Sequence, residues 1–164
     1  MNECKRSENN WTRVAVFAGG DRGHYRTDFD CFVGVDRGSL WVLEEDLPLA
    51  LAVGDFDSVT ADERQLIQKR AQHFVQAQPE KDDTDLELAL LTIFEKNPQA
   101  QVTIFGALGG RIDHMLANVF LPSNPKLAPY MRQIAIEDGQ NLLSYCPEGT
   151  SQLEPRSDYD YLAF

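Results

Sequence analysis

Two aspartates separated by one residue follow an apolar stretch in the first half of the sequence. Asp55 and Asp57 belong to VGDFDSVT, which comes directly after the uncharged run LALA. Two carboxylates so close repel one another unless a cation lies between them, and a hard cation such as Mg²⁺ takes carboxylate oxygens as ligands. A lone pair of this kind is more often a solvated turn, in which Asp57 or Ser58 caps the next helix.

A second acidic cluster shifts the balance toward a metal site. KDDTD (81–85) holds three aspartates in four residues just before a predicted helix, more than one helix cap requires. The helix dipole also stabilises an acidic residue there, so a structural role for Asp85 stays open. Two acidic clusters at separate strand ends favour one shared metal site, with Asp82 and Asp85 joining the aspartates of GDFDS.

A glycine-rich segment, FGALGGRIDHMLAN (105–118), offers groups that suit phosphate. Gly109 and Gly110 let the backbone approach a ligand and supply amide donors, and Arg111 adds a planar cation. The alternative is a plain turn followed by a helix with an acidic cap and an exposed histidine. Three further polar residues lie roughly on one side of the helix that begins here: Asp113, His114 and Asn118.

Two shorter loops follow the first two apolar runs. AGGDRGH contains Gly19 and Gly20, and GVDRG contains Asp36 and Arg37. Contact with a nucleotide and ordinary turn chemistry are both open for these residues. The sequence has no GxxxxGK[ST] motif and therefore no P-loop.

The elements that must position these loops alternate along the chain. Thr60 with Glu63 and Thr84 with Glu87 have the spacing of capping boxes at the start of helices. Strands alternating with helices predict a parallel sheet covered on both faces, an α/β fold with three layers whose loops meet at one edge. Strands are predicted at 13–18, 31–35, 49–53, 73–77 and 102–107, and helices at 62–72 and 85–96.

The last part of the chain has a different character. PSNPKLAP (122–129) is rich in proline and reads as a linker, followed by short strands separated by DGQN and PEGT turns. We therefore predict an α/β domain over 1–124 and the start of an all-β domain over 125–164. The β part packs on the first domain or on a partner chain, or it is incomplete.

Composition limits the partners. The net charge of −11 argues against general binding to nucleic acid. No apolar run approaches the roughly 18–20 residues of a membrane span, and the polar start MNECKRSENN lacks the apolar stretch of a secretory signal. Three scattered cysteines suit neither a disulfide framework nor a zinc site. A cytoplasmic protein without membrane or nucleic-acid partners is expected.

The motifs GDFDS, KDDTD and GALGGRIDH with Asn118, in this order, resemble the catalytic domain of the thiamine pyrophosphokinase family. GVDRG is similar to that family's GADGG-type loop, with Arg37 in place of a more usual glycine. The resemblance covers roughly residues 13–145. It implies transfer of a pyrophosphoryl group from ATP to the hydroxyl of thiamine, giving thiamine diphosphate and AMP, with Mg²⁺ as cofactor.

The resemblance further implies a homodimer. Its α/β domain would bind ATP, and its C-terminal β-sandwich domain would bind thiamine and would be cut short in this chain. The active site would lie between the α/β domain of one subunit and the β domain of the other. The implied metal ligands are Asp55, Asp57, Asp82 and Asp85. The implied groups near the phosphates, the nucleotide and thiamine are Gly19, Gly20, Asp36, Arg37, Gly109, Gly110, Arg111, Asp113, His114 and Asn118.

The residues suit this chemistry, because phosphoryl transfer depends mostly on positioning and electrostatic stabilisation. The role of proton acceptor for the thiamine hydroxyl would fall to Asp113. Two other functions stay open. One is a DxD phosphatase with Asp55 as nucleophile, although GDFDS lacks the Thr or Val expected after the second aspartate. The other is a nucleotide- or thiamine-binding module without turnover.

Overall fold

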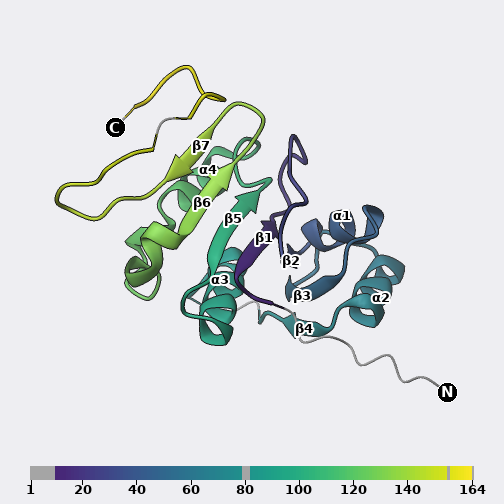
Figure 1. The fold of residues 1–164 in the computed structure, drawn as a ribbon. Helices are drawn as coiled ribbons and strands as arrows, with labels where there is room; N and C mark the ends of the chain where they lie inside the picture. The colour runs from purple at the N-terminus through teal and green to yellow at the C-terminus, as the bar shows by residue number, and fades with distance from the viewer. Residues whose placement is uncertain (1–9, 79–81, 155, 164) are drawn as a thin grey trace.

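A seven-stranded sheet forms the centre of the molecule (Figure 1). The computed structural model describes residues 10–78, 82–154 and 156–163. The strand order is β4-β3-β2-β1-β5-β6-β7, with all neighbours parallel except β6 and β7. The strands are β1 (Arg13–Phe17), β2 (Cys31–Val35), β3 (Leu49–Gly54), β4 (His73–Gln76), β5 (Gln101–Phe105), β6 (Ile134–Glu137) and β7 (Leu142–Ser144).

The five strands predicted from apolar runs are confirmed, with ends that differ by at most two residues. Every residue of β2 and β3 is buried. Strands in the middle of a parallel sheet are covered on both faces, which is why their sequences read as continuous apolar runs without alternation.

The helices are α1 (Gly38–Glu44), α2 (Ala61–Arg70), α3 (Asp85–Lys96) and α4 (Ile112–Val119). Both predicted capping boxes are present, at Thr60 with Glu63 and at Thr84 with Glu87. The short helix α1 was not predicted. It has seven residues, and its cap position, Arg37, makes no side-chain cap hydrogen bond, so the sequence carries no start signal for it.

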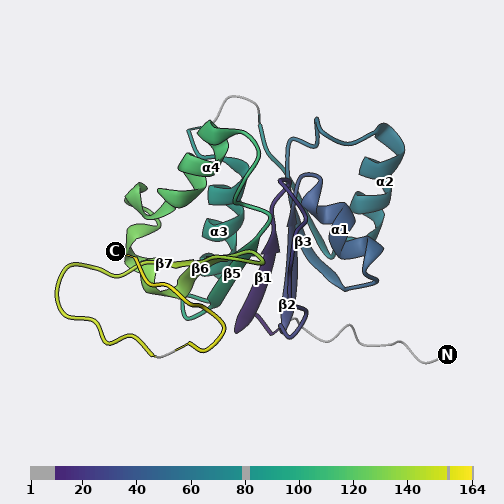
Figure 2. The same cartoon turned by 90° about the horizontal axis from the view of Figure 1, so that it is seen from above.

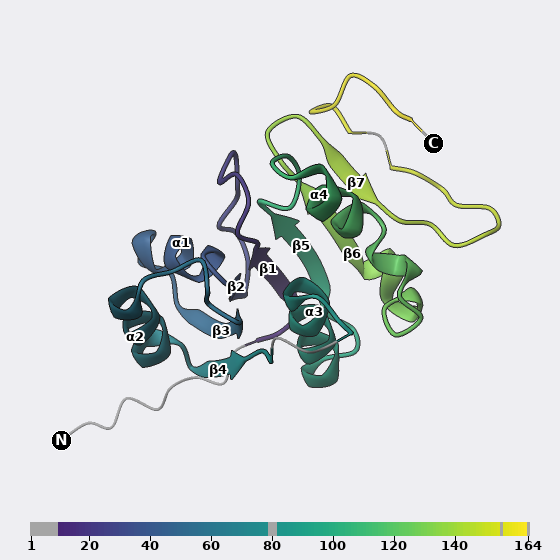
Figure 3. The same cartoon turned by 180° about the vertical axis from the view of Figure 1, so that it is seen from behind.

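The helices cover both faces of the sheet. Figure 2 shows α1 and α2 on one side of β1–β3 and α3 on the other, and Figure 3 shows α3 and α4 in front of the sheet when seen from behind. One core cluster joins Phe17 and Phe32 of the sheet to Ile67 of α2. The other joins Val33 to Leu90 of α3. The three-layer α/β fold predicted from the sequence is confirmed.

The C-terminal part begins within the same sheet. The predicted linker, 122–129, overlaps two short 3₁₀ helices, η1 (Leu121–Ser123) and η2 (Ala128–Gln133), and η2 leads into β6. Since β6 pairs parallel with β5 and β7 pairs antiparallel with β6, these two strands after residue 124 extend the first sheet. The division into two domains at this point stays a prediction. The described residues beyond β7 contain no helix or strand (Figure 1).

Across the described ranges, no helix has the length and apolar character needed to cross a bilayer.

Candidate active site

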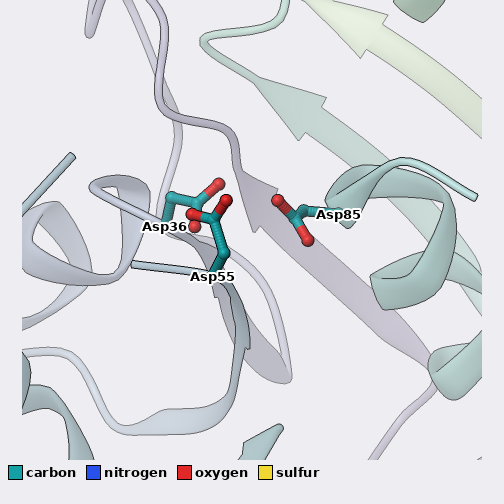
Figure 4. A group of neighbouring side chains, drawn as sticks. All are labelled: Asp36, Asp55 and Asp85. Carbon is teal, nitrogen blue, oxygen red and sulfur yellow. The ribbon is translucent and has the colours of Figure 1, made fainter. Parts of the chain in front are cut away.

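Three carboxylates from three separate segments converge at the carboxyl edge of the sheet (Figure 4). Asp36 follows β2, Asp55 follows the neighbouring strand β3, and Asp85 is the first residue of α3. One oxygen atom from each lies within 4.8 Å of the others. The three oxygens therefore form a donor set of the kind that Mg²⁺ prefers.

The backbone around Asp36 fixes the position of its side chain. Asp36 has a positive φ of 47° and donates its N–H to the carbonyl oxygen of Val53 at 2.9 Å. Its Oδ1 accepts the backbone N–H of Phe56 at 3.1 Å. A Cβ atom on Gly54 would lie only 1.9 Å from that Oδ1. The glycine of GDFDS thus provides the space that the Asp36 carboxylate occupies.

The environment of Asp36 raises the pKa of its carboxyl from the usual value of 3.8 to about 7. Burial is the main cause, since it penalises the charged form, and the nearby charges of Asp85 and Asp55 add to it. The hydrogen bond from Phe56 opposes the shift, because it favours the carboxylate. Three acidic groups held this close carry an electrostatic cost that a divalent cation would remove.

Local structure fixes the other two carboxylates. Thr84 caps α3: its Oγ1 accepts the N–H of Glu87 at 3.2 Å, while Glu87 Oε2 accepts the N–H of Thr84 at 2.7 Å. This places Asp85 at the helix start, where the dipole favours a negative charge. Asp55 Oδ1 accepts the N–H of Asp57 at 3.0 Å, which stabilises the turn of the loop.

The structure brings together only part of the predicted metal set. Asp55 and Asp85 belong to the cluster, whereas Asp57 and Asp82 are exposed and lie outside it. Asp36, predicted near the nucleotide, takes a place among the candidate ligands. Its signal was the GVDRG loop, but only the pairing of β2 with β3 shows that this loop adjoins GDFDS.

Two charged residues that follow the glycine-rich loop form an ion pair with each other. Arg111 donates to both carboxylate oxygens of Asp113, at 3.2 and 2.6 Å, and the two side chains are 70% and 63% exposed. This pairing keeps the pKa of Asp113 below its usual value. His114 is exposed on the same first turn of α4. The role of Asp113 as proton acceptor stays a prediction.

Asn118 holds the loop to the helix. Its Nδ2 donates to the backbone carbonyl oxygen of Ala107 at 2.9 Å, and its backbone carbonyl oxygen accepts a hydrogen bond from the hydroxyl of Tyr145 at 3.2 Å. Gly109 and Gly110 have φ values of 86° and 69°, a conformation that favours glycine. Gly110 faces open space, as a loop that receives a ligand requires.

The first glycine loop packs against the strand beside it. Gly20 donates its N–H to the carbonyl oxygen of Gly106 at 3.1 Å, and a Cβ on Gly20 would lie 2.4 Å from that oxygen. Close backbone packing therefore explains this glycine without a ligand. A Cβ on Gly19 would lie 3.8 Å from the Cβ of Arg37, so the loops after β1 and β2 adjoin. Contact of these residues with a nucleotide stays a prediction.

The fold and the site together define an α/β protein with a carboxylate centre at the carboxyl edge of a mostly parallel sheet. The sequence model of the family described as thiamin pyrophosphokinase, catalytic domain, matches residues 23–131. The chain belongs to the thiamin pyrophosphokinase family, and the family expected from the three motifs is confirmed.

Relatives in sequence and in structure agree with this assignment. The chain is 36% identical over 157 residues to the thiamine pyrophosphokinase of Bacillus subtilis, covering 92% of this chain and 72% of the relative. A thiamin pyrophosphokinase family protein from Enterococcus faecalis has a TM-score of 0.80 at 47% identity, covering 84% of this chain and 67% of its own. Yeast thiamin pyrophosphokinase shares the fold, with a TM-score of 0.59 at 11% identity and coverage of 83% and 61%.

The chain thus spans between about three fifths and three quarters of the length of these relatives.

Proposed function

We propose that this chain is the catalytic part of a thiamine pyrophosphokinase, which transfers the pyrophosphoryl group of ATP to the hydroxyl of thiamine and releases AMP. The family match and the curated relative support this function. The observation that carries the proposal is the convergence of Asp36, Asp55 and Asp85 in a chain of this family.

In this proposal, Asp36, Asp55 and Asp85 hold Mg²⁺, and the exposed Asp57 and Asp82 lie at the rim of the site. The donor set fits the ion, since three carboxylate oxygens within 4.8 Å of one another suit a hard divalent cation. When bound, Mg²⁺ supplies positive charge that offsets the charge of the triphosphate and polarises its oxygens.

The chain's own groups orient the nucleotide. The exposed amides of Gly109 and Gly110, with positive φ, suit phosphate oxygens, and Arg111 beside them supplies a planar cation. Arg111 pairs with Asp113, so a bound phosphate would compete with that carboxylate for the guanidinium. Asn118 stabilises the same loop by its hydrogen bond to the carbonyl oxygen of Ala107.

The proposal includes a cytoplasmic homodimer without nucleic-acid or membrane partners. The net charge of −11 supports the absence of nucleic acid. Large apolar side chains exposed on and after α4 support a partner subunit: Ile112 is 70% exposed, Leu116 46% and Phe120 61%, at a spacing of four residues.

The nucleotide product distinguishes this function from its alternatives. The protein is incubated with ATP and Mg²⁺, with and without thiamine, and the products are separated by chromatography. We expect AMP and thiamine diphosphate in equal amounts, only when thiamine is present. Asp55→Asn should lower the rate about 100-fold or more, beyond the roughly 10–100-fold typical when a group behind a metal ligand is removed. Asp62→Asn, a change to an exposed aspartate in the first turn of α2, should leave the rate unchanged.

Other outcomes point to the alternatives. Formation of ADP instead of AMP contradicts the proposal. Release of inorganic phosphate from simple phosphoesters, lost in Asp55→Asn, indicates the phosphatase. Binding of ATP or thiamine in calorimetry without turnover indicates the binding module.

A further inference from the structure

One side-chain amide binds two carboxylates that flank a candidate metal ligand. Asn124 lies between η1 and η2, and its Nδ2 donates to Asp83 Oδ1 at 3.2 Å and to Glu87 Oε1 at 3.0 Å. Asp83 precedes Asp85 by two residues and Glu87 follows it by two. The segment that reads as a linker in the sequence therefore contacts side chains on both sides of Asp85, Asp83 in the acidic loop and Glu87 in the first turn of α3.

The turn around Asn124 is itself firmly held. The carbonyl oxygen of Asn124 accepts the N–H groups of Leu127 and Ala128, at 2.9 and 3.0 Å. Its Oδ1 accepts the N–H of Lys126 at 2.9 Å, which leaves Nδ2 pointing at the acidic loop. Leu121 and Leu127, on either side of the turn, are buried in the same core cluster as Leu86 and Leu90 of α3.

Charge reinforces the amide. Lys126 Nζ donates to Asp83 Oδ2 at 2.6 Å, so both oxygens of Asp83 are bound by the turn. Each oxygen of the Glu87 carboxylate accepts one hydrogen bond: Oε1 from Asn124 Nδ2, and Oε2 from the N–H of Thr84 in the capping box. The same carboxylate thus joins the turn to the first residues of α3.

We infer that Asn124 is a positioning residue that holds Asp85 in the geometry needed for the metal, an inference that rests on the proposed function. Asn124 binds the side chains two residues before and two residues after Asp85, from a turn whose leucines pack in the same core cluster as α3. The two carboxylates that Asn124 binds lie beside Asp85 in the sequence and are not members of the three-carboxylate cluster. Outer-shell groups that orient metal ligands typically change metal affinity 10–100-fold when they are removed.

The test measures binding of Mn²⁺, used in place of Mg²⁺, by isothermal titration calorimetry without nucleotide or thiamine. We expect Asn124→Ala to bind Mn²⁺ about tenfold more weakly than the wild type. Asn124→Asp should bind it more weakly still, because a carboxylate would face Asp83 and Glu87. The matched control is Gln133→Ala: the Gln133 amide also donates twice, to the carbonyl oxygens of Pro98 and Ala100, away from the acidic loop.

The melting temperature of the metal-free protein separates positioning from stability. Asn124→Ala and Gln133→Ala should lower it by similar amounts, and only Asn124→Ala should lose metal affinity. An affinity within twofold of the wild type in Asn124→Ala, or an equal loss in Gln133→Ala, overturns the inference. Should the Asn124 variants fail to fold, Lys126→Met removes one arm of the same network, and unchanged Mn²⁺ binding there also overturns it.

The assay also separates this inference from the proposed function. A wild type that binds Mn²⁺, loses affinity in Asn124→Ala and yet forms no AMP from ATP and thiamine contradicts the proposed function alone. A wild type that binds no Mn²⁺ but forms AMP from ATP and thiamine overturns this inference and leaves the proposed function intact.

Discussion

Phe56 donates its backbone N–H to Oδ1 of Asp36 at 3.1 Å, and this hydrogen bond joins the loop after β3 to the end of β2. The same carboxylate has an oxygen within 4.8 Å of Asp55 and Asp85 oxygens. Asp36 therefore has two separable properties: an oxygen that accepts a hydrogen bond from the GDFDS loop, and a negative charge in the cluster.

Two substitutions of Asp36 separate these properties. Asp36→Asn keeps an oxygen for the Phe56 N–H and removes the charge, whereas Asp36→Ala removes both. We expect Asp36→Ala to have a free energy of unfolding about 1–3 kcal/mol lower than Asp36→Asn, because a half-buried N–H is left unpaired. Both should lose Mg²⁺ affinity. Urea unfolding and calorimetry measure the two effects, and equal stability of the two variants would contradict the role of the hydrogen bond.

Stability without metal should fall as the pH rises toward neutrality. The pKa of Asp36 is about 7 in the folded protein and 3.8 in its ordinary state, so the folded form binds more protons between these values. The stability that Asp36 contributes through this extra proton is present in full below about pH 4 and is lost as the pH rises through 7. Asp36→Asn should flatten this part of the stability profile, measured by urea unfolding from pH 4 to 8. The same slope in both proteins would show that another group titrates.

Mg²⁺ should bind more tightly as the pH rises through the same range, because the metal competes with the proton on Asp36. Calorimetric titrations at pH 6 and pH 8 measure this. A pH-independent affinity would place Asp36 outside the metal site.

The fold was largely predictable because its signals are local. Apolar runs identify β1 to β5, and the two Thr-x-x-Glu motifs identify the starts of α2 and α3. The short helix α1 and the attachment of β6 to β5 were not predicted. A seven-residue helix without a capping residue has no strong local pattern, and the pairing of β6 depends on contacts with a strand about thirty residues away.

The two capping threonines give a matched pair of variants. Thr84→Ala and Thr60→Ala each remove a side-chain cap and should each lower the free energy of unfolding by about 1 kcal/mol. Only Thr84 precedes a cluster residue, so only Thr84→Ala should also weaken Mn²⁺ binding. Thermal unfolding and calorimetry on both variants check this. Equal loss of Mn²⁺ affinity in both would mean that the effect is global.

Gly54 should tolerate no side chain. A Cβ there would lie 1.9 Å from Asp36 Oδ1, so Gly54→Ala must displace the carboxylate. We expect the free energy of unfolding to fall by about 1–3 kcal/mol. We also expect Mn²⁺ to bind more weakly. At Gly19 the nearest atom to a new Cβ is 3.8 Å away, an ordinary contact. Gly19→Ala should therefore keep the wild-type free energy of unfolding, and a Gly54→Ala protein with wild-type stability and affinity would contradict the close approach.

The acidic residues of the candidate site were predictable from the sequence only in part, because a motif does not specify the direction of each side chain. Residue type and motif selected Asp55 and Asp85 as candidate ligands together with Asp57 and Asp82, but they do not show which of these carboxylates face the same point. In the loop after β3, Asp55 points into the cluster and Asp57 to solvent, although the sequence treats them alike. Side-chain direction depends on backbone angles, such as the positive φ of Asp36 and Phe56, that a motif does not specify.

The most direct test of the proposed metal centre is calorimetric titration of the protein with Mn²⁺, comparing Asp85→Asn with Asp82→Asn. The first change removes a carboxylate of the three-residue cluster, and the second removes an exposed one from the same acidic loop. The expected result is one binding site in the wild type, retained within a few-fold in Asp82→Asn and weakened at least 100-fold in Asp85→Asn. Unchanged binding in Asp85→Asn would contradict the convergence of Asp36, Asp55 and Asp85 on one cation.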